Sequence, residues 1–191
     1  MPEVPRFGWR VLLASTLLAA IAATGTYVVL AGGDDDPADP GDIAQIELDP
    51  ETAPGDVDTI RFTEFDGTEV TLASLRGKPV VVNFFASTCA PCITEMPDLE
   101  AVHQALGDRV TFLGLAVADR KDDAQKLVDR TGVTYRTAQD RDGSILEALR
   151  GTVLPTTVLL DADGNVVATH NGQLDADQLR ELLSEKLGIS G

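Results

Sequence analysis

The stretch VVVNFFASTCAPCITEMP, residues 80–97, contains both cysteines of this 191-residue chain. The run PVVVNFFA, residues 79–86, is β-branched and aromatic, which is typical of a strand buried on both faces. Apolar residues then recur at helical spacing from Cys89 to about Leu106, and Gly107 can end a helix. The stretch therefore predicts a core strand that leads directly into a helix, with both cysteines at the junction.

The place of the cysteines at the start of this helix favours a redox pair. Backbone N–H groups and the positive end of the helix dipole stabilise a thiolate at Cys89. Pro91 fits the first helical turn, where its missing N–H costs nothing. Cys92 follows three positions later on the same face. This arrangement suits an exposed attacking thiol at Cys89 and a more buried resolving thiol at Cys92.

Two other uses of the pair are a zinc site and a structural disulfide. Zinc requires three or four ligands, and the only histidines, His103 and His170, are not in a paired spacing. We expect His103 at the edge of the core, His170 exposed at a strand end, and no metal site. A structural bridge that closes so short a loop removes little unfolded-state entropy. We therefore expect a redox-active Cys89–Cys92 disulfide and no other cofactor.

The rest of the C-terminal region alternates between strand and helix patterns. Asp66 and Gly67 separate two alternating runs, which is typical of a β-hairpin. We expect further strands at 109–118, 156–161 and 165–170, and helices at 121–132, 144–150 and 175–188. This order predicts an α/β domain over residues 59–191, with a central mixed sheet flanked by helices and an N-terminal β-hairpin extension.

Residues 11–30 contain no charged side chain. A helix of that length spans about 30 Å, the thickness of the hydrocarbon core of a bilayer. Arg6 and Arg10 precede the segment, and Asp34 to Asp36 follow it. We therefore expect residues 1–10 in the cytoplasm and one transmembrane anchor, with the C-terminal domain outside the cytoplasm. A cleaved signal peptide and a buried core helix are the alternatives, although signal cores usually span roughly 7–15 residues.

Residues 31–58 contain ten acidic residues and no Lys or Arg. Such a segment, rich in Asp, Pro and Gly, cannot bury enough apolar surface to fold. We interpret it as an extended tether between the anchor and the domain. The net charge of the whole chain is −16, which argues against binding to nucleic acid.

The sequence around the cysteines resembles the membrane-anchored thioredoxin-like proteins of the TlpA/ResA type. The matching residues of that pattern are Asn83, Phe84, Ala86, Cys89, Pro91, Cys92, Glu95 and Pro97. LPTTVLLDADG, residues 154–164, resembles the Pro-Thr strand and hairpin of the same family. The resemblance covers roughly residues 59–187 and implies a thioredoxin-like fold with thiol–disulfide oxidoreductase activity.

The resemblance also implies roles for residues outside the cysteine pair. Pro155 is expected to be cis and to face the pair, and Leu154, Pro155 and Thr156 to bind an extended substrate segment. The alternative for Pro155 is a simple strand-entry proline. Glu95 lies one helical turn after Cys92, where a buried carboxylate with a raised pKa relays the proton of the resolving thiol. From spacing alone, Glu95 is a helix-surface residue.

The chain departs from the family pattern beside the cysteines. Phe85 and Thr88 stand where the family has tryptophans, so Phe85 is expected to keep the packing while Thr88 alters the recognition surface. Thioredoxin itself has a buried Asp where this chain has Asn83. The acid–base role of that Asp therefore cannot be placed at Asn83.

The resemblance favours a membrane-anchored reductant of exported disulfide-containing proteins, such as apocytochrome c. Its electrons are expected from a membrane thiol carrier. We expect a monomer, because nothing in the sequence suggests a larger assembly. A disulfide donor and a peroxiredoxin-like thiol peroxidase are alternatives, although the chain lacks the Pro-x-x-x-Thr-x-x-Cys pattern of peroxidases, since Thr88 is adjacent to Cys89. A third class is a non-enzymatic chaperone, which would not need both cysteines.

Overall fold

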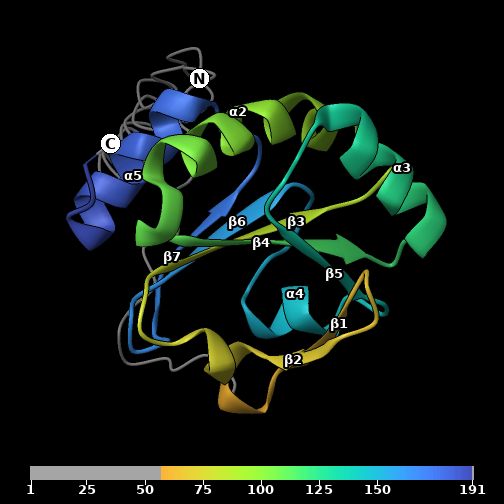
Figure 1. Cartoon of the computed structure of the whole chain (residues 1–191), viewed down its shortest axis with the longest axis horizontal. Helices are drawn as coiled ribbons and strands as arrows, with labels where there is room; N and C mark the ends of the chain where they lie inside the picture. The colour runs from red at the N-terminus through yellow and green to blue at the C-terminus, as the bar shows by residue number, and fades with distance from the viewer. Residues whose placement is uncertain (1–56, 191) are drawn as a thin grey trace, which may run out of the picture. The chain divides into compact units, whose positions relative to one another are not determined.

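The computed structural model describes residues 57–190, which form a seven-stranded mixed sheet with helices on both faces (Figure 1). The strand order is β2-β1-β5-β4-β3-β6-β7. The strands are β1 (Arg61–Glu64), β2 (Glu69–Thr71), β3 (Val80–Phe85), β4 (Thr111–Val117), β5 (Arg136–Asp140), β6 (Thr156–Leu160) and β7 (Val166–Asn171). The helices are α2 (Ala90–Leu106), α3 (Lys121–Thr131), α4 (Ser144–Ala148) and α5 (Ala176–Leu187).

The central strand β3 is parallel to β4 and antiparallel to β6. Helices α2, α3 and α5 cover one face of the sheet, and α4 covers the other (Figure 1). This confirms the predicted α/β architecture with a mixed sheet. The end of β3 leads into α2. The cysteine segment therefore lies at the end of the central strands, where β3 stops and the antiparallel β6 begins.

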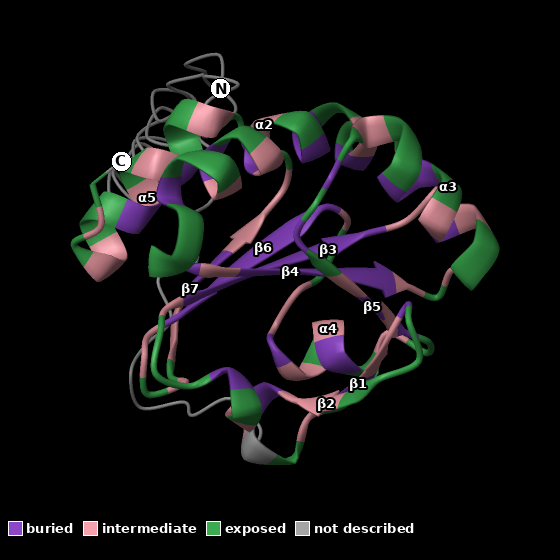
Figure 2. Cartoon of the chain, viewed as in Figure 1, coloured by how far each residue is buried: buried purple, intermediate pink, exposed green. Residues whose placement is uncertain are grey.

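The side chains of β3 build both halves of the core. Val81 and Phe85 pack in the cluster under α2 and α5, whereas Val82 and Phe84 pack in the cluster that includes Ile145 of α4. Every residue of β3 is buried, as the apolar run predicts, and Figure 2 shows the strand in the middle of the buried layer. Because β3 is buried on both faces, it gives the start of α2 a rigid support.

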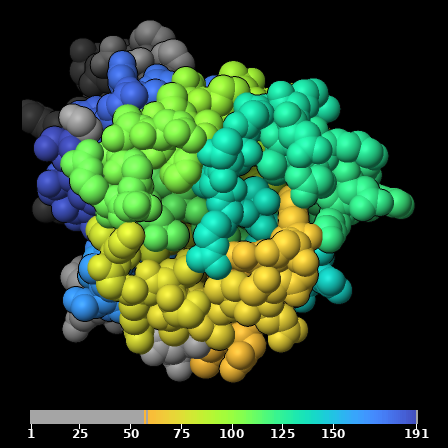
Figure 3. All heavy atoms as spheres, viewed as in Figure 1, coloured from red at the N-terminus to blue at the C-terminus, as the bar shows by residue number. Residues whose placement is uncertain are grey.

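The predicted hairpin is present, with Phe62 of β1 opposite Val70 of β2. The hairpin and the residues that follow it form the lower part of the face drawn in Figure 3, below α2 and α3. Asp175 caps α5 through a capping box, and Gly188 ends that helix with a left-handed φ of 66°. The hairpin and both ends of α5 therefore form where the sequence predicts them.

Strand β5 was not predicted. Its sequence, RTAQD, has a single aliphatic side chain, Ala138, which is buried between β4 and β1. The exposed Arg136 is paired with Glu64 of β1, and this cross-strand ion pair supports a polar strand that hydropathy cannot reveal.

The predicted membrane segment and acidic tether lie outside the described residues. Within residues 57–190, no helix combines the length and the apolar character that crossing a membrane requires.

Candidate active site

Cys89 and Cys92 form a disulfide at the start of α2, with 5.3 Å between their Cα atoms. Cys89 is the N-cap residue of the helix, and its Sγ accepts the backbone N–H of Cys92 at 3.3 Å. Cys89 is partly exposed, whereas Cys92 has no exposed surface. The pair thus has the difference in accessibility that the sequence predicts for an attacking and a resolving thiol.

The first turn of α2 is suited to a thiolate at Cys89. It contains Pro91 and no acidic residue, so the N–H of Cys92 and the helix dipole act on the sulfur without opposition from that turn. The carbonyl of Cys89 accepts the N–H of Ile93, and its own N–H donates to the carbonyl of Ala86. Both backbone groups of Cys89 are therefore fixed, which leaves the sulfur as its reactive group.

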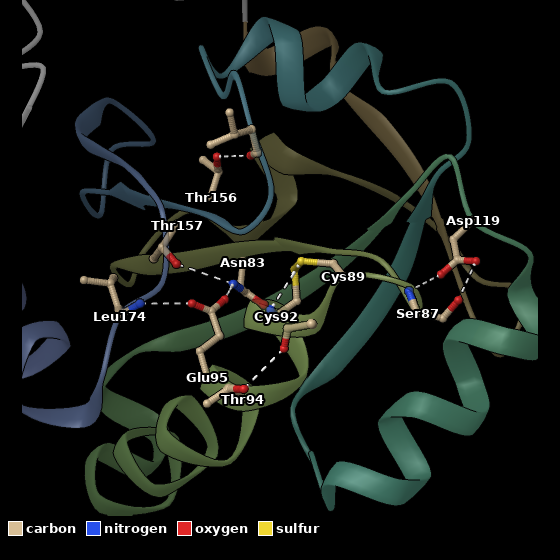
Figure 4. Close-up of a disulfide and its surroundings, with 12 residues drawn as sticks. Asn83, Ser87, Cys89, Cys92, Thr94, Glu95, Asp119, Thr156, Thr157 and Leu174 are labelled. Atoms are coloured by element: carbon tan, nitrogen blue, oxygen red, sulfur yellow. Dashed lines mark hydrogen bonds between the residues drawn. A yellow bond between two sulfur atoms is a disulfide. The ribbon is translucent and has the colours of Figure 1, made fainter. Parts of the chain in front are cut away.

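Glu95 lies one turn after Cys92 and is completely buried, so it is not the surface residue that spacing alone suggests. Its Oε1 accepts a hydrogen bond from Asn83 Nδ2 at 2.6 Å, and its Oε2 accepts the N–H of Leu174 at 3.1 Å. Asn83 lies on β3, and Leu174 lies in the loop between β7 and α5. Figure 4 shows these three residues in one row beside the disulfide.

Burial raises the pKa of Glu95 from 4.5 to about 7, because the folded protein removes water from the charged form. The hydrogen bonds from Leu174 and Asn83 favour the carboxylate and oppose this rise only in part. Glu95 can therefore gain and lose a proton near neutral pH, as a group that relays a thiol proton must.

Asn83 can serve both protonation states of Glu95. Its Oδ1 is buried and has no hydrogen-bond partner in the described part of the chain, while its Nδ2 also lies 3.4 Å from Thr157 Oγ1. Half a turn of the amide would aim Oδ1 at Glu95. A protonated carboxyl needs such an acceptor, whereas the carboxylate needs the donor Nδ2.

The peptide bond between Leu154 and Pro155 is cis, as the family resemblance implies. Thr156 at the start of β6 is opposite Phe84 near the end of β3. The loop before β6 therefore lies at the same end of the strands as the cysteine segment. The carbonyl of Pro155 accepts the N–H of Gly172 at 2.9 Å. Within residues 57–190, the backbone N–H and C=O of Leu154 make no backbone hydrogen bond.

Thr156 supports this loop from within. It is fully buried, and its Oγ1 lies 2.7 Å from the carbonyl of Val153 and 2.9 Å from Asn171 Oδ1. The same Asn171 oxygen accepts the N–H of Thr152 at 3.0 Å. Pro155 is buried as well, so Leu154 and the residues before it present the accessible part of the loop.

Two features of the site were missed by sequence reasoning. Val153 is 53% exposed and is the one large hydrophobic side chain with such exposure among residues 57–190. Asp119, in the loop between β4 and α3, accepts hydrogen bonds from Ser87, two residues before Cys89 (Figure 4). Val153 directly precedes Leu154, which the family resemblance assigns to substrate binding, so its position could have indicated a role at the site. No local sequence pattern indicates a role for Asp119.

The two residues that depart from the family pattern behave differently. Phe85 is fully buried and belongs to the core under α2, whereas Thr88 is exposed immediately before Cys89. The packing role expected of Phe85 is confirmed, and Thr88 lies on the surface that a partner must approach.

Neither histidine belongs to a possible metal site among residues 57–190. Over residues 57–190, no three His, Cys, Asp or Glu side chains are grouped so that they could bind a metal ion. His103 is half-buried and packs against Phe112 and Tyr135. The expectation that His170 is exposed was wrong, because it is half-buried, and burial lowers the pKa of its imidazole.

Residues 51–183 match the model of the Redoxin family, well over half of the chain. The chain belongs to the Redoxin family. The thiol–disulfide oxidoreductase ResA of Geobacillus thermodenitrificans is 33% identical over 125 residues, which are 64% of this chain and 71% of that relative.

Solved structures give the same fold. A DsbF homologue from Corynebacterium diphtheriae has a TM-score of 0.63 and 32% identity, with 77% of this chain and 96% of that structure covered. A secreted disulfide oxidoreductase of Mycobacterium tuberculosis has a TM-score of 0.60 and 28% identity, with coverage of 66% and 95%. With the disulfide at the start of α2, these matches make the chain a ResA-like, thioredoxin-fold thiol–disulfide oxidoreductase.

Proposed function

We propose that this oxidoreductase is a membrane-anchored reductant of disulfides in exported proteins. The observation that carries the proposal is the asymmetric pair at the start of α2, with Cys89 accessible, Cys92 buried and the titratable Glu95 one turn further. In this proposal residues 11–30 anchor the chain, residues 31–58 extend from the membrane, and a monomeric domain acts outside the cytoplasm.

The reaction begins with the reduced enzyme. The Cys89 thiolate attacks one sulfur of the substrate disulfide, forms a mixed disulfide and releases the other substrate sulfur as a thiolate, which takes a proton from water. The N–H of Cys92, which points at Cys89 Sγ in the oxidised structure, and the helix dipole stabilise the attacking thiolate.

The second step releases the product. Glu95 takes the proton of the Cys92 thiol, and the resulting thiolate attacks Cys89 Sγ. The enzyme disulfide forms, the second substrate sulfur leaves as a thiolate, and two electrons have passed to the substrate. A base with a pKa of about 7 accepts this proton and returns it readily at neutral pH.

The enzyme must then be reduced again. A membrane thiol carrier attacks Cys89 Sγ, because Cys92 Sγ is buried, and the two steps run in reverse with the carrier as the electron donor. The Cys89–Cys92 pair is the redox group, and the proposal requires no other cofactor.

The substrate binds along the loop that precedes β6. An extended segment pairs with the backbone N–H and C=O of Leu154, next to the cis Pro155. The exposed Val153 contacts a side chain of that segment. Thr156 holds the loop in place from the core. Apocytochrome c, whose haem-binding cysteines must be reduced, is the substrate that we would test first.

The deciding experiment is the reduction potential of the full-length chain in detergent, titrated against thiol buffers. A two-electron transition near or below about −230 mV, toward the thioredoxin end of the scale, supports a reductant. A value near about −120 mV, close to that of the oxidising periplasmic enzyme DsbA, contradicts the proposal and indicates a disulfide donor.

A trapping experiment tests the roles of the two cysteines. Cys92→Ser should accumulate a mixed disulfide with an oxidised Cys-x-x-Cys-His peptide, because the enzyme then has no second thiol that can attack Cys89 Sγ. Cys89→Ser should form none. Exchange by Cys89→Ser at the wild-type rate would contradict the assignment of Cys89 as the nucleophile.

A further inference from the structure

The turn before Cys89 is held by a carboxylate from another element. Asp119 Oδ2 accepts the N–H of Ser87 at 2.5 Å, and Oδ1 accepts Ser87 Oγ at 3.0 Å (Figure 4). Ser87 and Asp119 are 32 positions apart, at the ends of the neighbouring parallel strands β3 and β4. The Asp119 side chain therefore joins the cysteine segment to the loop between β4 and α3.

The second end of the same turn is also fixed. The N–H of Cys89 donates to the carbonyl of Ala86 at 3.1 Å, so the four residues from Ala86 to Cys89 form a closed turn. Asp119 holds this turn at Ser87. Together the two contacts fix the path by which the chain leaves β3 and delivers Cys89 to the N-terminus of α2.

Asp119 also places a negative charge beside this turn. The first turn of α2 has no acidic residue, and the adjacent Arg120 pairs with Asp123 at 3.5 Å. Glu95, one turn after Cys92, is buried on α2. A like charge near a thiolate disfavours it and raises the pKa of the thiol. A negative charge on Asp119, which contacts Ser87 two residues before Cys89, would act against the helix dipole at Cys89.

We propose that Asp119 is a positioning residue for Cys89, which fixes the turn that presents the sulfur and sets the balance between its thiol and thiolate. A destabilised thiolate makes the reduced form less favourable, so Asp119 shifts the pair toward the reducing end of the scale. The inference depends on disulfide exchange by the pair and not on the direction of electron flow proposed above.

A purely structural role for Asp119 has a different signature. Its Oδ1 also accepts the N–H of Arg120 at 2.8 Å, immediately before α3, so the residue helps to begin that helix. If this were its only role, substitution would lower the thermal stability and leave the chemistry of Cys89 unchanged.

The test compares four variants of the full-length chain in detergent. Asp119→Asn keeps the shape and removes the charge, Asp119→Ala removes both, and Ser87→Ala removes one hydrogen bond and keeps the charge. Asp122→Asn is the control, because it removes an exposed carboxylate in the first turn of α3. The readouts are the Cys89 thiol pKa in a Cys92→Ser background, the equilibrium constant with glutathione, and the exchange rate.

Asp119→Asn should lower the Cys89 pKa by about half a unit, which is about a threefold change in the thiol–thiolate ratio. The equilibrium with glutathione should shift in the same variant toward the reduced protein. Asp119→Ala should in addition slow exchange by about tenfold because the turn is released. Ser87→Ala should slow exchange without a lower pKa.

The proposal is overturned if Asp119→Asn and Asp119→Ala match Asp122→Asn in pKa, equilibrium constant and exchange rate. It is equally overturned if the Asp119 variants lose thermal stability alone. Should Asp119→Ala fail to fold, Asp119→Asn and Ser87→Ala decide the outcome, because each keeps at least one hydrogen bond between the two loops.

Discussion

Asn83 on β3 donates a 2.6 Å hydrogen bond from Nδ2 to Glu95 on α2, and both side chains are buried. The bond links the central strand to the helix that carries the cysteines. It favours the carboxylate form of Glu95, whereas burial favours the neutral form, and burial has the larger effect on the pKa. The balance places the titration of Glu95 near neutral pH.

Glu95→Gln should remove the inflection near pH 7 from the pH profile of the step in which Cys92 resolves a mixed disulfide. In the wild type the rate should rise with pH through about 7, as Glu95 becomes able to accept the thiol proton. The variant should be slower by about a hundredfold at pH 7.5, the usual loss on removal of a general base. Stopped-flow decay of a preformed mixed disulfide measures this rate.

Asn83→Ala is the matched variant for this measurement. Removal of the hydrogen bond that favours the carboxylate should move the rising limb to higher pH without abolishing it. Equal resolution rates in the wild type and Glu95→Gln from pH 5 to 9 would rule out a proton relay through Glu95.

The same carboxyl should make the stability of the fold depend on pH. The pKa of Glu95 is raised on folding, so the protonated form is favoured in the native state. The free energy of unfolding should therefore fall as pH rises from about 4.5 to about 7 and then stay level. At about 1.4 kcal/mol per pKa unit, the difference from 4.5 to about 7 is worth up to about 3 kcal/mol.

Glu95→Gln should lack this contribution. Its neutral amide can donate to Asn83 Oδ1, which has no partner among the described residues, and accept from Leu174. Urea unfolding of the oxidised proteins should show the variant gaining on the wild type between pH 4 and pH 8, by about 1–3 kcal/mol. An unchanged difference between the two pH values would mean that Glu95 titrates normally.

Local sequence signals predicted the part of the site that lies on β3 and α2. The apolar run of β3 is buried on both faces, which fixes where the strand ends and where α2 must begin. Cys89 then stands at the N-cap, where the helix dipole favours a thiolate, and Pro91 stands in the first turn, where a missing N–H is tolerated. These properties depend on neighbours in the sequence and not on distant contacts.

Contacts between distant segments were beyond the reach of such patterns. Ser87 and Asp119 are ordinary polar residues of two loops, and only the parallel pairing of β3 and β4 brings them together. β5 escaped prediction for a related reason, because its polar side chains find their partners on other elements: Arg136 bonds to Glu64 of β1, and Asp140 accepts the N–H groups of Ile145 and Leu146 in α4. The family resemblance supplied the cis bond at Pro155, which spacing alone left open.

Asn171→Ala should loosen the loop that contains the cis proline. Asn171 Oδ1 accepts the N–H of Thr152 at 3.0 Å and lies 2.9 Å from Thr156 Oγ1. Loss of these bonds should lower the free energy of unfolding by about 1–2 kcal/mol and reduce kcat/KM for a protein disulfide. Asn171→Asp keeps the acceptor and is the control. Equal stability of the wild type and Asn171→Ala would contradict this supporting role.

Val153→Ser should weaken the binding of protein substrates and leave the chemistry intact. Val153 is 53% exposed, so its substitution should change the free energy of unfolding by less than about 0.5 kcal/mol. A substrate that covers this side chain would lose about 1 kcal/mol of apolar contact, which raises KM by about fivefold. The measurement compares kcat/KM for an oxidised polypeptide with that for oxidised glutathione, which is too small to cover the loop. A parallel loss with both substrates would show that Val153 acts on the cysteine pair, whereas a loss with the polypeptide alone places the substrate on this loop.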